Sequence, residues 1–129
     1  MADKLFSSKE LRRFASDVCG DDPDLFTELL EDCRNDLRDL LGRIEAARRK
    51  GSWRDLNRAA HSIKSTGRTF GSPLVKERAL GVEKLSENES GPGDPARLDR
   101  AIADLRESCA AFGEELARIG RSPGDFLKT

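Results

Sequence analysis

The chain contains one histidine, His61, and its nearest helical neighbours are basic or polar. On a helix, residues three and four positions apart share a face. By this rule His61 is surrounded by four side chains and has a fifth two turns further on: Asn57, Arg58, Lys64, Ser65 and Arg68. The predicted face is cationic, polar and exposed to solvent.

This constellation suits the transfer of a phosphoryl group. An imidazole with its ordinary pKa of roughly 6.5 is largely an uncharged nucleophile at neutral pH, and a ring nitrogen can accept a phosphoryl group. The group carries about two negative charges, and Lys64 can place its ammonium against the phosphoryl oxygens. The small residues Ser65, Gly67 and Gly71 keep the surroundings low, so that a partner's active site can close over the ring. We therefore predict His61 as the phosphoacceptor and Lys64 as the stabilising cation.

Three further side chains have two interpretations each. Gly67 falls on the predicted core side of its helix, so it serves either close helix packing or docking of a partner. Glu83 can face the acceptor helix and support the imidazole or Lys64, although a surface carboxylate is its more ordinary role. Arg68 is an ordinary solvated charge unless a partner docks there. The residues predicted to dock a partner are Asn57, Arg58, Ser65, Gly67, Arg68 and Gly71.

The sequence lacks the residues that other kinds of chemical site require. A single histidine cannot supply a site built from several His ligands, and the three cysteines are far apart without a C-x-x-C pair. The chain also has no glycine-rich nucleotide loop, no Walker lysine and no clustered acidic pocket. We expect no bound metal or cofactor, and no kinase activity or nucleotide site in the chain itself.

Charge and hydropathy narrow the class of partner. The formal net charge of -1 provides no basic field for nucleic acid. No apolar run is long enough to cross a membrane, and the N-terminus lacks the apolar stretch of a signal peptide. We expect a soluble, cytoplasmic protein that binds neither nucleic acid nor membranes.

Five amphipathic stretches, separated by Gly, Ser and Pro, account for most of the chain. Apolar residues recur at steps of three and four, which predicts helices, and capping residues precede them. The predicted helices cover residues 8–18, about 23–50, 53–70, about 73–87 and 95–119. The four longer ones bury their stripes most simply in an antiparallel four-helix bundle. The predicted fold class is all-α, with a short additional N-terminal helix.

The domain prediction is one unit over residues 1–129, with the bundle at about 23–119. The closing GRSPGDFLKT has no evident apolar face, so residues 120–129 are predicted to form a flexible tail. Met1 and this tail favour a complete protein. A monomer is expected, because the bundle needs no partner to bury its stripes.

The stretch AAHSIKSTGRTFGSPLVKERALGVEKLSE resembles the signature of histidine phosphotransfer (HPt) domains. The family pattern is A-H-x-[LI]-K-[GS]-[SA]-[SAG]-x-x-[LFV]-G, followed by a Leu-rich helix that ends in L-E. Its positions correspond here to Ala60, His61, Ile63, Lys64, Ser65, Thr66, Gly67, Phe70 and Gly71. A G-D-D-P-x-L-x-x-x-L-L-E opening at residues 20–31 is also similar to the family. Ser65 stands where many members have Gly, and Ser-Pro follows Gly71 where a small residue is more usual.

The resemblance implies a bundle whose second helix exposes the phosphoaccepting histidine at mid-height. It implies exchange with the aspartate of receiver domains or phosphorylation by a hybrid sensor histidine kinase, with Mg²⁺ supplied by the partner. Two alternatives stay open. One is a pseudo-HPt adaptor that binds the same partners without being phosphorylated, and the other is a plain structural bundle used for oligomerisation.

Overall fold

The computed structural model describes residues 4–128. These residues form helices joined by turns and contain no strand. The helices are α1 (Ser8–Asp17), α2 (Pro23–Lys50), α3 (Trp53–Phe70), α4 (Pro73–Leu85), α5 (Pro95–Arg121) and α6 (Pro123–Leu127). The prediction of an all-α fold is therefore confirmed. Within residues 4–128 no helix is both long and apolar enough to cross a membrane.

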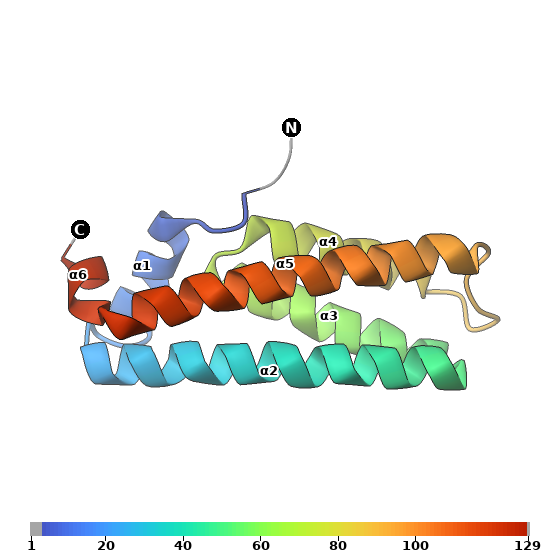
Figure 1. The fold of residues 1–129 in the computed structure, drawn as a ribbon, viewed down its shortest axis with the longest axis horizontal. Helices are drawn as coiled ribbons and strands as arrows, with labels where there is room; N and C mark the ends of the chain where they lie inside the picture. The colour runs from blue at the N-terminus through green and yellow to red at the C-terminus, as the bar shows by residue number, and fades with distance from the viewer. Residues whose placement is uncertain (1–3, 129) are drawn as a thin grey trace.

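The four long helices lie side by side, and each packs against two others. Contacts join α2 to α3, α3 to α4, α4 to α5 and α5 back to α2, which closes the ring (Figure 1). The short turns after α2 and α3 force neighbouring helices to run in opposite directions. Within the ring, α3 lies between α2 and α4.

Three of the long helices, α2, α4 and α5, begin with an Asp or Ser directly before a proline. The side chains of Asp22, Ser72 and Asp94 accept backbone N–H groups of the first turns of these helices. Proline fits the next position because an N–H there would have no partner in the helix. Helix α3 begins without a proline, and Ser52 before it donates its hydroxyl to Asp55 Oδ2 over 2.8 Å.

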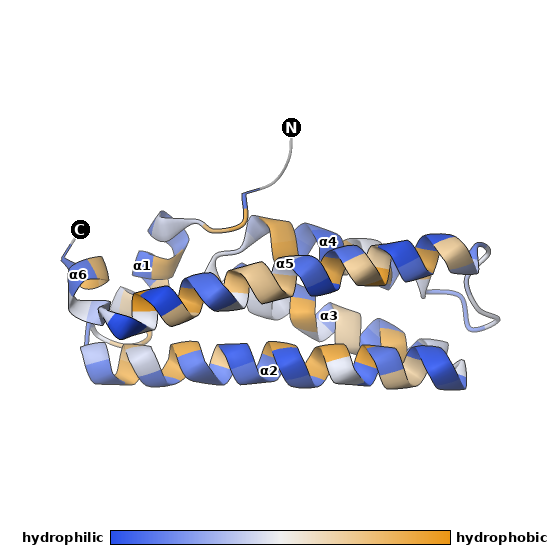
Figure 2. Cartoon of the chain, in the orientation of Figure 1, coloured by the Kyte–Doolittle hydropathy of each residue, from blue (hydrophilic) through white to orange (hydrophobic). Residues whose placement is uncertain are grey.

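The buried residues form a single apolar core inside the ring. Figure 2 shows apolar and polar residues alternating along α2 and α5, as expected when one stripe of each helix faces inward. The largest fully buried side chains are Phe26, Phe112, Leu11, Leu30, Ile44, Leu56, Ile63, Leu98, Leu105, Leu116, Val75 and Val82. They come from α1, α2, α3, α4 and α5, so the short N-terminal helix shares the core of the bundle.

The C-terminal segment differs from its prediction. Helix α5 continues to Arg121, and α6 turns back toward the start of α2 at the end of the bundle where α1 also lies (Figure 1). The Phe126 ring stacks on the Phe26 ring with centroids 5.7 Å apart. The expectation that residues 120–129 lack an apolar face is therefore wrong for the residues through 127. Periodicity missed this contact because α6 spans only one turn.

The junction of α3 with α4 depends on two glycines. A Cβ at Gly67 would lie 3.0 Å from the backbone nitrogen of Lys76 and 3.3 Å from the carbonyl oxygen of Ser72. Gly71 ends α3 at φ 81°, and its carbonyl accepts the Ser7 N–H over 2.8 Å. Both glycines are buried, so α3 and α4 meet almost backbone to backbone.

We predict that Gly67→Ala lowers the free energy of unfolding by about 1 kcal/mol, because overpacking against backbone atoms outweighs the better helix propensity of alanine. Chemical denaturation measures the change. Gly42→Ala is the matched control, since Gly42 also lies inside a helix but has nothing within 4 Å of a Cβ. This control should gain up to about 1 kcal/mol. A gain for both variants would contradict the packing role of Gly67.

Candidate functional site

His61 lies in the middle of α3 and points out of the bundle. Its neighbours Ala60 and Ile63 are fully buried, so the helical register places the imidazole just outside the core. The His61 side chain is 59% exposed. A partner can therefore reach the ring without any opening of the bundle.

A carboxylate on the next helix holds the imidazole. Glu83 of α4 places Oε2 2.6 Å from His61 Nδ1 and Oε1 2.6 Å from Lys64 Nζ. The Glu83 side chain is only 15% exposed and that of Lys64 only 16%. One carboxylate thus bridges two residues on consecutive turns of α3. Glu83 therefore lies where it can support both the imidazole and Lys64, the first of the two roles considered for it. We call His61, Lys64 and Glu83 the bridged triad.

The electrostatics of the triad keep Glu83 ionised. Burial raises the pKa of Glu83, but the hydrogen bonds from Lys64 and His61, together with their charges, outweigh it and hold the pKa below its ordinary value. An ionised carboxylate only accepts hydrogen bonds, so the short contact requires a proton on His61 Nδ1. In the neutral ring, Nε2 then keeps its lone pair and is the nucleophilic atom.

Asn57 and Ser86 fix the part of α4 that carries Glu83. The Asn57 amide donates to the Glu83 carbonyl over 2.8 Å and to Ser86 Oγ over 3.3 Å. Buried Ser86 donates in turn to the carbonyl of Val82 over 2.8 Å. Sequence reasoning missed Ser86, because nothing along the chain links it to Asn57. It also placed Asn57 on the docking surface, whereas its amide is used inside the molecule to tie α3 to α4.

The other predicted docking residues fall into two groups. Arg58, Ser65 and Arg68 are exposed on α3, as a docking role requires. Gly67 and Gly71 are buried beneath α4 and α1, as the packing interpretation of Gly67 required, so they offer a docking partner little surface. Their absent side chains let neighbouring backbones approach closely, which explains why a motif on the acceptor helix contains them.

The cysteines and acidic residues offer no second chemical site in the described range. Cys19, Cys33 and Cys109 are free and buried, and burial raises the pKa of the Cys33 and Cys109 thiols to about 12. Such thiols are packing residues. Residues 4–128 contain no cluster of three or more His, Cys, Asp or Glu side chains placed to hold a metal ion.

Comparison with known proteins gives one match. A protein-family model described as "Hpt domain" matches residues 28–120, a range that contains the whole bridged triad. No curated protein and no solved structure matches the chain significantly. The matched range covers most of the chain.

The lowered pKa of Glu83 predicts a pH-dependent contribution to stability. The contribution is complete above the ordinary glutamate pKa of 4.5 and disappears as the pH falls through the lower pKa of the folded state. Glu83→Gln should therefore reduce the free energy of unfolding by about 1–2 kcal/mol at pH 7 and by much less at pH 3. Urea denaturation at the two pH values measures this difference.

Glu77→Gln provides the control, because Glu77 is an exposed carboxylate on the same helix without an ion-pair partner among the described residues. It should change stability little at either pH. An equal loss of stability for Glu83→Gln at pH 7 and pH 3 would show that the ionised bridge is not the cause.

Proposed function

The chain belongs to the Hpt domain family, and on this premise we propose that it accepts and donates a phosphoryl group on His61 in a two-component phosphorelay. Hpt domains are phosphocarriers rather than enzymes, and they interact with receiver domains and kinases. The observation that supports the proposal is the bridged triad. An exposed imidazole has its Nδ1 held by Glu83, and Glu83 also holds the ammonium of Lys64.

The proposed chemistry is a direct exchange with a partner's aspartyl phosphate. Nε2 of His61 attacks the phosphorus, the N–P bond forms, and the bond from phosphorus to the partner's carboxylate oxygen breaks with its electron pair left on that carboxylate. The proton on Nδ1 stays in place while the ring becomes cationic. Glu83 stabilises this positive charge, and Lys64 offsets the charge of the phosphoryl oxygens. The reverse sequence returns the group to a receiver.

These roles divide the groups needed for phosphotransfer between the chain and its partner. The chain supplies a positioned nucleophile and two fixed charges, while the partner supplies the aspartate, the Mg²⁺ and the acidic residues that hold it. We propose that the chain acts as a monomer, since its stripes are buried within the bundle. It should neither bind ATP nor complete a catalytic cycle by itself.

The proposal predicts which residue becomes labelled. Incubation with a phosphorylated receiver, or with a hybrid kinase and labelled ATP, should give wild-type protein an acid-labile, base-stable label. His61→Gln should take up none, because a glutamine amide cannot form the phosphoramidate. Circular dichroism of the variant verifies its fold. Partners that bind the wild type but never label it would instead identify a pseudo-HPt adaptor.

A second prediction distinguishes a role of Lys64 in phosphotransfer from a role in the fold. Lys64→Ala should keep the helical circular dichroism signal but slow phosphotransfer about 10-fold, which corresponds to about 1.4 kcal/mol of transition-state stabilisation. Lys64→Arg should restore part of the rate, since it returns the positive charge. Lys9→Ala, at an exposed position of α1, serves as the control and should transfer at the wild-type rate. Unchanged transfer by Lys64→Ala would contradict the assigned role.

A further inference from the structure

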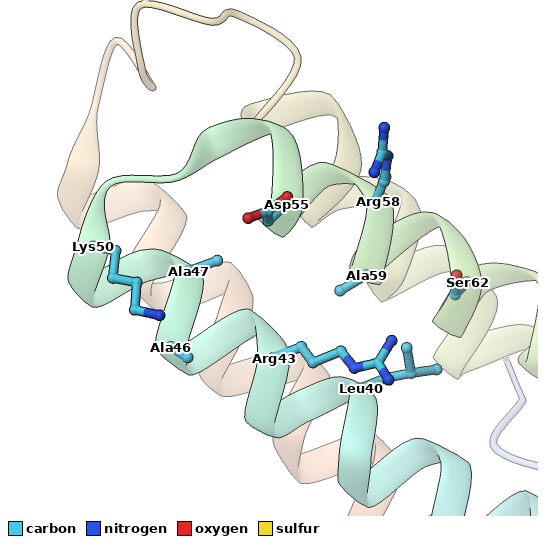
Figure 3. A pocket seen from close by; sticks show the side chains of 9 residues that line it. All are labelled: Leu40, Arg43, Ala46, Ala47, Lys50, Asp55, Arg58, Ala59 and Ser62. Atoms are coloured by element: carbon cyan, nitrogen blue, oxygen red, sulfur yellow. The ribbon is translucent and has the colours of Figure 1, made fainter.

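A groove of about 390 Å³ lies between α2 and α3, directly beside the acceptor residue. Figure 3 shows Arg43 and Lys50 on α2 across from Asp55 and Ser62 on α3, with Arg58 pointing outward from α3. Alanines of both helices line the groove, so small side chains leave the space open. Because Ser62 follows His61 in the chain, a partner that covers the imidazole from this side also covers the groove.

The groove carries positive charge that the chain does not neutralise. Arg43, Lys50 and Arg58 are all exposed, and among residues 4–128 no carboxylate lies within ion-pair distance of any of them. Asp55 is the one acidic residue of the lining, and it accepts the Ser52 hydroxyl. The groove is therefore bordered by three cations, of which Arg58 points outward, and by one carboxylate that already has a hydrogen-bond partner.

The opposite side of α2 is arranged differently. There, Arg48 pairs with Asp99 of α5 over 2.7 Å, and Glu45 pairs with Arg106. Arg48 and Glu45 on the α5 side of the helix are thus paired within the molecule. Those on the α3 side, next to His61, are available to a partner.

We propose that this groove docks an acidic segment of the receiver domain that exchanges its phosphoryl group with His61, an inference that rests on the proposed function. Charge complementarity identifies the partner surface, since carboxylates on the receiver find three uncompensated cations beside the acceptor. The cations are spread along an open groove and exposed to water. This arrangement suits several weak contacts to an extended protein surface rather than the enclosed binding of one small anion.

The test reverses the charge of the groove. The double variant Arg43→Glu/Lys50→Glu should lower kcat/KM for transfer from a phosphorylated receiver about 10-fold at low salt, mostly through KM. The difference should shrink at 500 mM salt, because salt screens exposed charges. Arg38→Glu/Arg49→Glu is the matched control, since it makes the same charge change on α2 but at exposed residues on the α5 side. It should behave as wild type.

Binding measured without transfer separates this inference from the proposed function. In the His61→Gln background, titration calorimetry with a receiver domain chosen for binding should show weaker affinity on charge reversal at Arg43 and Lys50. Equal affinity for that variant and for Arg38→Glu/Arg49→Glu would overturn the groove proposal, whether or not wild type takes up label. Competition by millimolar inorganic phosphate would also overturn it, because it would indicate a small-anion site.

Discussion

The close approach of α3 to α4 is the constraint on which the site depends. Gly67 lets the start of α4 lie against α3, and Asn57 ties the other end of α4 through the Glu83 carbonyl and Ser86. These two contacts fix the backbone of α4 so that the Glu83 carboxylate lies within hydrogen-bond distance of His61 and Lys64. Forming the bridge costs side-chain entropy but no further backbone entropy, because the backbone that carries each partner is already fixed.

Burial divides the bridged triad into a supporting part and a reacting part. Glu83 and Lys64 are mostly shielded from water, whereas His61 is mostly exposed. Shielding strengthens the attraction between the carboxylate and its two donors, and it holds the imidazole in one tautomer. Exposure leaves Nε2 open to a partner. The proposed nucleophile is therefore positioned without an enclosed active site, which suits a phosphocarrier whose partners provide the remaining chemistry.

The two sides of α2 differ in their ion pairs. Toward α5, Arg48 pairs with Asp99 and Glu45 pairs with Arg106 across the helices. Toward α3, Arg43 and Lys50 border a groove and have no acidic partner within the described residues. A surface charge pair adds little to stability in either place. Leaving charges unpaired on this side thus costs the fold little and keeps them available for the proposed docking of a receiver.

The sequence by itself determined the helices, because apolar residues at steps of three and four and an Asp-Pro or Ser-Pro start are local features. It also singled out His61 and Lys64, whose spacing on one helix needs no tertiary information. Tertiary structure decided everything that joins distant segments. The bridge from Glu83 to His61 spans 22 residues, the tie from Asn57 to Ser86 spans 29, and α6 packs on α2 through Phe126 and Phe26. Periodicity shows which face of a helix is apolar and placed Gly67 on the core side. Only packing determines which helix that face meets, so the burial of Gly71 and the role of Asn57 became visible only in three dimensions.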